Sequence, residues 1–128
     1  MLVVAVALID ENGHCLMQQR PADKRHGGLW EFPGGKVEAG EHPAAALVRE
    51  LREELAIGVA QEDLEPFGFA TDMPVIMLLY RCRVWRGVPQ PLAAQALRWA
   101  SPAALAALPM PPVDVPLLAA LAAAGQAG

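Results

Sequence analysis

The apolar residues of this chain fall into short runs separated by polar turns. Residues 2–9 form a continuous, valine-rich apolar run, which predicts a buried β-strand. The following turn, residues 10–13, ends in Asn-Gly, a strong hairpin signal, so residues 15–19 are predicted to return as the partner strand. Further strands are predicted over residues 66–70, 75–85 and 94–99, and a short apolar segment covers residues 29–32.

One stretch has the period of a long helix, from Pro43 to Leu55. Pro43 suits the first helical turn, and no Gly, Pro or Asn interrupts the residues after it. The apolar residues gather on one side of this helix, and the acidic residues gather on the neighbouring side. The apolar set is Ala44, Leu47, Val48, Leu51 and Leu55, and the acidic set is Glu50, Glu53 and Glu54.

Two more helices are predicted near the C-terminus. Ser101-Pro102 is a good start for a short helix to about Leu108, and Asp114 is placed to cap a second helix to about Ala123. Prolines separate the two helices. This order of elements predicts an α/β fold, with a mixed sheet flanked by helices on both faces, in a single domain over residues 1–128.

The acidic face of the first helix is the main chemical signal. Glutamates on a helix are most often a solvated face, and like charges at these spacings repel by a few tenths of a kcal/mol per pair. Here, however, Gly34, Gly35 and Gly40 precede the helix and allow the backbone to turn sharply toward a ligand. Several carboxylates together with a backbone carbonyl form a hard oxygen site that suits Mg²⁺ or Mn²⁺.

The same stretch resembles the Nudix box. The matching residues are Gly35, Glu41, Arg49-Glu50-Leu51, Glu53-Glu54 and Ile57, with Ala56 where the family has Gly. The likeness extends to residues 19–22, 30–36 and 111–117, which are similar to the MutT branch of small nucleoside-triphosphate pyrophosphohydrolases. The resemblance implies an α/β/α sandwich and a cut between the α and β phosphorus atoms that gives a nucleoside monophosphate and pyrophosphate.

The resemblance also implies roles for individual residues. Glu53, Glu54 and the Gly34 carbonyl are the expected metal ligands, and Glu50 is a further ligand and the expected general base. Which glutamate acts as the base differs among family members. Arg49 and Glu41 are expected to hold the carboxylates in place.

The substrate is expected to meet a different set of residues. Arg20, at a strand exit beside the basic and mobile-looking loop 20–28, is the best phosphate candidate. Trp30 and Phe32 are expected to divide between the core and the ligand side, with Phe32 as the substrate contact. Asp114 is expected to read the base, although a plain helix cap is an equal alternative.

Two departures from the MutT pattern bear on activity and substrate. Residues 92–95 hold no carboxylate, and Ala93 stands where the branch has a glutamate. Asp114 stands where MutT has an asparagine; an ionised Asp only accepts hydrogen bonds, which leaves the base open between oxidised guanine and cytosine. The leading hypothesis is an enzyme that removes 8-oxo-dGTP. The alternatives are a CTP or dCTP pyrophosphohydrolase, a Nudix hydrolase for another diphosphate, and a catalytically weakened nucleotide-binding module.

Composition narrows the list of partners. The net charge of −4, without a visible basic stripe, argues against a nucleic-acid polymer. Cys15 and Cys82 lie in apolar stretches and are expected to be free, buried thiols. The apolar run at residues 2–9 is too short to span a membrane and lacks the flanks of a signal peptide, so the expected location is the cytoplasm. The expected assembly is a monomer or a homodimer.

Overall fold

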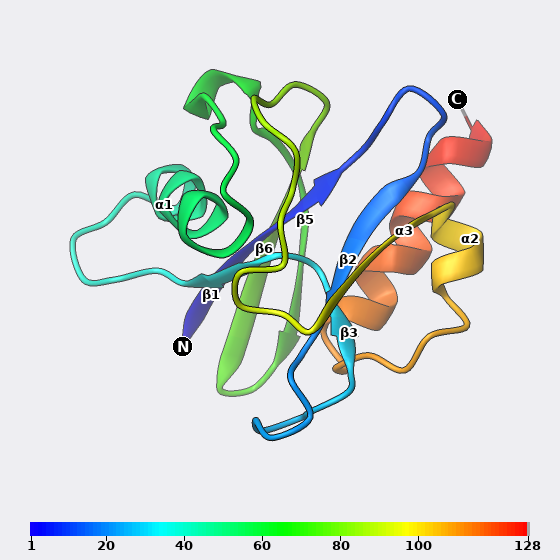
Figure 1. The fold of residues 1–128 in the computed structure, drawn as a ribbon, viewed down its shortest axis with the longest axis horizontal. Helices are drawn as coiled ribbons and strands as arrows, with labels where there is room; N and C mark the ends of the chain where they lie inside the picture. Colours follow the sequence, from blue (N-terminus) through cyan, green and yellow to red (C-terminus); the bar gives the residue numbers. More distant parts are fainter. Residues whose placement is uncertain (128) are drawn as a thin grey trace.

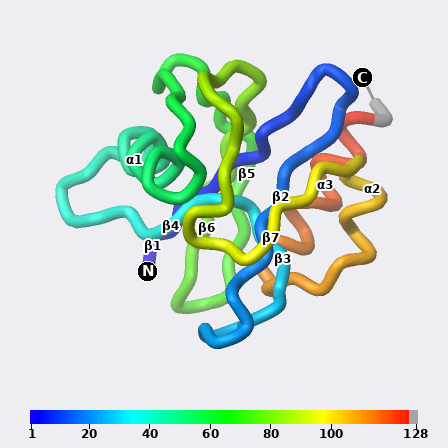
Figure 2. The backbone as a smooth tube through the Cα atoms, in the orientation of Figure 1, coloured from blue at the N-terminus to red at the C-terminus, as the bar shows by residue number. Residues whose placement is uncertain are grey.

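Strand β1 (Leu2–Leu8) is an interior strand of the larger of two sheets in this computed structural model, which describes the backbone of residues 1–127 and side-chain burial through residue 125. The sheet has the order β4-β1-β6-β5 (Figures 1 and 2). Strand β1 runs parallel to β6 (Val75–Cys82) and antiparallel to β4 (Gly34–Lys36), and β5 (Glu65–Asp72) pairs with β6 in the antiparallel sense. The predicted mixed sheet is therefore confirmed.

A second sheet contains β2 (Cys15–Gln19), flanked by β3 (Trp30–Glu31) and β7 (Ala96–Ala100). Residues 15–19 form a strand as predicted, and β1 ends at Leu8, one residue before its predicted end. The predicted pairing of residues 15–19 with residues 2–9 is wrong. Only one isolated bridge, between Ile9 and Cys15, joins the two strands. Both edges of β1 are taken by β4 and β6, so β2 makes its ladders with β3 and β7 instead.

Alternate residues of β1 face two different cores, because successive side chains point to opposite sides of a strand. Val4, Val6 and Leu8 pack toward α1 (Pro43–Leu55), while Ala5 and Ala7 pack toward α3 (Asp114–Ala127). Figure 1 shows α1 on one side of the strands, with α3 and the short α2 (Pro102–Leu105) on the other. The predicted placement of helices on both faces is confirmed.

The helix α1 begins and ends as predicted. His42 caps its start, with Nδ1 accepting a hydrogen bond from the Ala44 N–H at 3.1 Å. Its buried residues are Ala44, Ala46, Leu47, Leu51 and Leu55, so Ala46 joins the expected apolar face and Val48 is only partly buried. The helix ends at Ala56, which adopts the left-handed conformation (φ 57°, ψ 33°) and donates its N–H back to the last turn.

Several element boundaries differ from the prediction, and the end of β6 and the start of β7 follow the ends of their pairing partners. Strand β6 stops at Cys82 rather than at Trp85, because its partner β1 ends at Leu8, opposite Cys82. Trp85 instead stacks on Trp99 of β7, with ring centroids 5.9 Å apart. Strand β7 begins at Ala96, α2 ends at Leu105, and α3 continues to Ala127; a short 3₁₀ turn at Gln61–Asp63, which was not predicted, leads into β5.

Two smaller expectations concern the cysteines and the helices. Cys15 and Cys82 are free and buried, as predicted. Among the helices described, none is long and apolar enough to cross a membrane.

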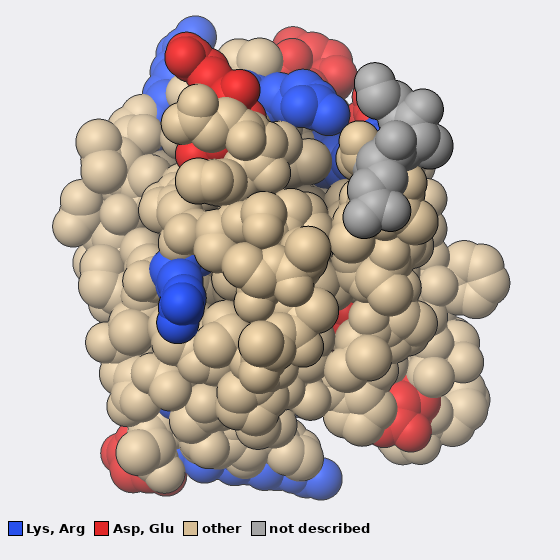
Figure 3. Space-filling model, turned by 90° about the vertical axis from the view of Figure 1, so that its right-hand side faces the viewer, with Lys and Arg blue, Asp and Glu red and all other residues tan. Residues whose placement is uncertain are grey.

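The face formed by α2 and α3 carries few charged side chains, which lie mostly at its upper and lower borders in Figure 3.

The geometry of Ala56 predicts that replacing it with glycine stabilises the protein. A left-handed conformation strains any residue with a Cβ, whereas glycine adopts it freely. We expect Ala56→Gly to raise the free energy of unfolding by ~0.5–1 kcal/mol, measured by urea denaturation. The control is Ala45→Gly inside α1, which should lower it by ~1 kcal/mol. A loss of stability in Ala56→Gly would contradict this explanation.

Candidate active site

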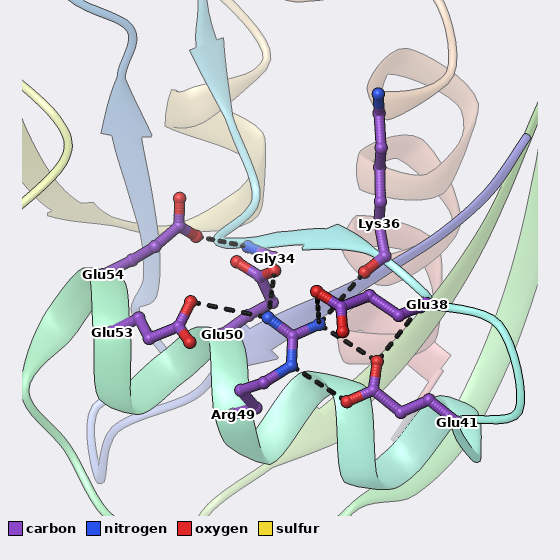
Figure 4. A network of polar contacts seen from close by, with 8 residues as sticks. All are labelled: Gly34, Lys36, Glu38, Glu41, Arg49, Glu50, Glu53 and Glu54. Atoms are coloured by element: carbon purple, nitrogen blue, oxygen red, sulfur yellow. Dashed lines mark hydrogen bonds and ion pairs between the residues drawn. The ribbon is translucent and has the colours of Figure 1, made fainter.

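The acidic face of α1 lies directly against the glycines of β4 (Figure 4). The Gly34 N–H donates a hydrogen bond to Oε1 of Glu54 at 3.3 Å. A Cβ at Gly34 would collide with the Val4 carbonyl oxygen of β1, so glycine is needed for this close approach of two strands. A Cβ at Gly35 would lie 2.5 Å from the carboxyl carbon of Glu50. Gly34 therefore allows the close approach of β4 to β1, and Gly35 provides the space that the Glu50 carboxylate occupies.

Arg49 is the hub of the polar network in Figure 4. Its guanidinium donates to Glu41 at 2.9 and 3.0 Å and to Glu50 at 2.9 Å, and makes a longer contact of 3.4 Å with Glu53. It also donates to the carbonyl oxygen of Lys36 at 3.3 Å, which ties α1 to the end of β4. The expected ion pairs of Arg49 with Glu41 and Glu53 are thus present. The hydrogen bonds from Arg49 lower the pKa of Glu41 to about 2.

Glu50 and Glu54 have a different electrostatic environment from Glu41. Burial, together with the nearby carboxylates of Glu50 and Glu31, raises the pKa of Glu54 to about 7. Burial also raises the pKa of Glu50, although Arg49 opposes the change. Glu53 is the most exposed of the three helix glutamates, with 59% of its side chain accessible, against 15% for Glu50. The site therefore holds more negative charge than Arg49 alone offsets.

The three acids share one helix face, as predicted, but they do not form a closed metal cage. In the part of the chain that the structure describes, no three His, Cys, Asp or Glu side chains converge closely enough to hold an ion. The Arg49 guanidinium contacts both Glu50 and Glu53. The donor set nevertheless fits a hard divalent cation, because it consists of carboxylate oxygens whose mutual repulsion a cation would relieve.

Gln18 is part of this site and was not identified from the sequence. Its side chain lies close enough to Glu54 to lower the pKa of that carboxyl group. The residue is only 3% exposed, and its Oε1 has no hydrogen-bond partner among the described residues. A buried, unpaired acceptor costs ~1–3 kcal/mol, so it calls for an explanation. The available signal was a polar residue directly after the apolar run of residues 15–17.

Arg20 stands at the exit of β2, where it pairs with Glu31. Its Nε donates to Glu31 at 2.9 Å, and its Nη1 donates to the Arg25 carbonyl oxygen at 3.2 Å. The backbone of Arg20 also bonds to Leu29 and Gly28, so loop 20–28 is tied together at its base. These contacts fix the base of the loop, and its mobility stays a prediction. Glu31 was also not identified from the sequence. Its negative charge helps to raise the pKa of both Glu54 and Asp114.

Asp114 and Phe32 meet on the opposite side of β3 from the helix acids. Oδ2 of Asp114 accepts a hydrogen bond from the Phe32 N–H at 3.0 Å, while its Oδ1 is buried without a partner in the described structure. Burial is the main reason that the pKa of Asp114 is raised, to about 7. The carboxylate is turned toward a segment 82 residues earlier in the chain. This contact gives Asp114 more than the role of a plain helix cap.

The aromatic residues beside Asp114 do not divide between core and ligand. Phe32 is 2% exposed, and both it and Trp30 pack in the same apolar cluster as α3. Residues two apart on a strand point to the same side, which is why the expected division is wrong. The Phe32 ring is therefore a core residue in this structure, and it is the Phe32 N–H that reaches Asp114.

The loop before β7 passes the C-terminal end of α1, where the MutT pattern would place a further glutamate. The Leu92 N–H donates to the Glu54 carbonyl oxygen at 3.1 Å, so neighbouring Ala93 lies near the acidic face. Gln95 ties the same loop to loop 20–28, because its Oε1 accepts from the Ala22 N–H at 3.1 Å. The loop borders the site but brings no carboxylate to it.

Comparison with known proteins agrees with this arrangement. A family model described as NUDIX domain matches residues 1–121. The chain is 39% identical to the CTP pyrophosphohydrolase of Escherichia coli K12, over 96% of this chain and 93% of the relative. It is 36% identical to the 8-oxo-dGTP diphosphatase of the same organism, over 94% of this chain and 95% of the relative.

Solved structures show the same likeness. A MutT structure, from a study of the Aliivibrio salmonicida and Vibrio cholerae proteins, matches with a TM-score of 0.85 and 32% identity, covering 95% of this chain and 96% of that one. The solution structure of the E. coli ORF135 protein matches with a TM-score of 0.82 and 38% identity, covering 98% and 92%. The sequence motif, the fold and these matches together show that the chain belongs to the Nudix family.

Proposed function

We propose that this protein is a Mg²⁺-dependent nucleoside-triphosphate pyrophosphohydrolase that cleaves between the α and β phosphorus atoms and releases pyrophosphate. The observation that carries the proposal is the crowded acidic face of α1 against the glycines of β4, with the pKa of Glu54 raised to about 7. Such a site is suited to a divalent cation and repels a bare polyphosphate. The relatives named as pyrophosphohydrolase and diphosphatase, which match nearly the whole chain, support the same reaction class.

Nudix hydrolases generally use a divalent metal. Glu53, Glu54, Glu50 and the Gly34 carbonyl would hold the cation here, with Mg²⁺ as the proposed ion and Mn²⁺ as a substitute. When bound, the cation would offset the charge of the triphosphate and activate a water. The Gly34 N–H donates a hydrogen bond to Glu54, and the role of the Gly34 carbonyl as a ligand stays a prediction.

Glu50 is the proposed general base, which takes a proton from the attacking water at its carboxylate. Its position supports this role, because the carboxylate is packed over Gly35 and fixed by Arg49 at 2.9 Å. Burial raises the pKa of Glu50, which makes its carboxylate a better proton acceptor. Arg49 and Glu41 act through these contacts by holding the acid in place.

Asp114 is the proposed reader of the base, and 8-oxo-dGTP is the leading substrate. Its ionised form would accept hydrogen bonds from the amino and imino groups of guanine or from the amino group of cytosine, and only its protonated form would donate one to guanine O6. CTP is therefore the second candidate, favoured by this carboxylate and by the relative named CTP pyrophosphohydrolase. Phe32 would contribute to base recognition by holding Asp114 through its N–H. Arg20 would bind phosphate through the guanidinium N–H groups that are not bonded to Glu31 or Arg25.

The proposed setting is the cytoplasm, where nucleotide pools are found, with a small nucleotide and no nucleic-acid polymer as partner. The absence of a carboxylate at Ala93 favours a weaker metal site, and it is the argument for the alternative of a nucleotide-binding module with little turnover. Pyrophosphate release from 8-oxo-dGTP, dGTP, CTP and dCTP with Mg²⁺ tests the proposal. Binding without release would support the module, and release of orthophosphate would indicate another linkage.

Glu53→Gln is expected to abolish metal-dependent turnover while leaving the fold intact. The side chain is 59% exposed, so the substitution removes a proposed ligand without disturbing the core. Pyrophosphate release and the thermal midpoint of unfolding, measured on the same preparation, check both halves of this prediction. Turnover equal to that of the original protein would rule out the proposed ligand set.

Gly35→Ala is expected to displace the Glu50 carboxylate and lower kcat by ~100-fold, because small displacements of catalytic groups have effects of this size. The added methyl would meet the flexible end of Glu50, so stability should change little. Gly58→Ala is the matched control, since a Cβ there has no heavy atom closer than 3.9 Å. Equal kcat values for the two variants would contradict the proposed position of the Glu50 carboxylate against Gly35.

The raised pKa of Asp114, about 7, predicts a base preference that depends on pH. Below that pH the group is neutral and donates, and above it the group is ionised and only accepts. The ratio of kcat/KM for 8-oxo-dGTP to that for CTP should therefore fall by ~10-fold or more between pH 6 and pH 8. Asp114→Asn should flatten the profile, because an amide does not titrate in this range. A ratio independent of pH in the original protein would refute this role.

A further inference from the structure

The side chain of Gln18 points toward the acidic face of α1. On β2, Leu16 packs in the cluster that contains the α1 residues, while Met17 packs in the cluster that contains α3. Because side chains alternate along a strand, Gln18 faces the same side as Leu16. Its side chain reaches Glu54 there, and the residue is only 3% exposed.

The chemistry of the two groups fixes the orientation of the Gln18 amide. An ionised carboxylate only accepts hydrogen bonds, so the Nε2–H of Gln18 faces Glu54 when Glu54 is ionised. The opposite orientation would place Oε1 against the carboxylate, which is unfavourable for two acceptors. Oε1 is consequently left buried without a partner in the described structure.

We propose that Gln18 is a positioning residue for Glu54, which holds this carboxylate in the orientation that metal binding and turnover require. The Gly34 N–H from β4 donates to Glu54 at 3.3 Å, and the Gln18 side chain from β2 lies beside the same carboxyl group. The buried, unpaired Oε1 supports this role, because an apolar residue would fill the position without leaving an unpaired acceptor. The proposal rests on the proposed function, in which Glu54 is a metal ligand.

The test compares Gln18→Leu with Gln19→Leu by Mn²⁺ titration of the metal-free protein, followed by electron paramagnetic resonance without nucleotide. Gln19 is the neighbouring residue on the other face of β2, where its amide bonds to the Gly28 carbonyl oxygen at 3.1 Å. We expect Gln18→Leu to weaken Mn²⁺ binding by ~10-fold and to lower kcat at an unchanged KM for the nucleotide. Gln19→Leu should leave Mn²⁺ affinity unchanged.

Stability separates a positioning role from a structural one. If Gln18 acts on Glu54, Gln18→Leu should unfold at the same or a higher temperature while Mn²⁺ affinity falls. Gln18→Met, an unbranched side chain of similar length, provides a second variant should leucine disturb the fold. Unchanged Mn²⁺ affinity in a folded variant at position 18 would overturn the inference.

The variant Glu54→Gln shows whether an error lies in the role of Gln18 alone or in the proposed function. If Glu54→Gln loses Mn²⁺ binding and the Gln18 variants do not, only the role of Gln18 is wrong. If Glu54→Gln binds Mn²⁺ as tightly as the original protein, the metal site itself is wrong, and the inference falls with it.

Discussion

Repulsion among the carboxylates on one face of α1 is the constraint on which the site depends. Glu50, Glu53 and Glu54 lie within about one turn of one another on one helix, and Glu31 adds further negative charge beside Glu54. Arg49 offsets part of this negative charge, because its guanidinium contacts Glu41, Glu50 and Glu53. Glu54 is not among these partners, and its pKa is raised to about 7. The charge that remains at Glu54 is what makes a cation a fitting partner.

The backbone of β4 makes this arrangement possible. Gly34 lies so close to β1 that a side chain would collide with the Val4 carbonyl oxygen, and Gly35 lies directly against the Glu50 carboxylate. The strand therefore packs closely against both β1 and the acidic face of α1, and its Gly34 N–H donates to Glu54. Two adjacent glycines thus serve different ends: Gly34 the packing of the sheet, and Gly35 the placement of an acid of the site.

Strand β3 connects the acidic site with the region of Asp114. Glu31 pairs with Arg20, and the next residue, Phe32, donates its N–H to Asp114. Glu31 also lies close enough to both Glu54 and Asp114 to raise their pKa values. The proposed phosphate end and base end of the substrate site are thus electrostatically coupled through two adjacent residues.

Some of this was determined by the sequence alone. The 3.6-residue period from Pro43 to Leu55 placed the apolar and acidic faces of α1, and the spacing of its acids and of Gly35 indicated the Nudix family, because both depend on local geometry. Similarly, the apolar run at residues 2–9 marked β1 as a buried strand. Local signals of this kind determine which elements form and what chemistry one helix face carries.

The tertiary structure decided which elements meet. The Asn-Gly turn predicted a hairpin, yet β2 pairs with β3 and β7, because β6 and β4 already occupy both edges of β1. Likewise, no local pattern could bring Gln18 to Glu54 or Asp114 to the Phe32 N–H, since these residues lie far apart along the chain. Burial produced the raised pKa values of Glu54 and Asp114, and burial is a property of the packed protein rather than of any single segment.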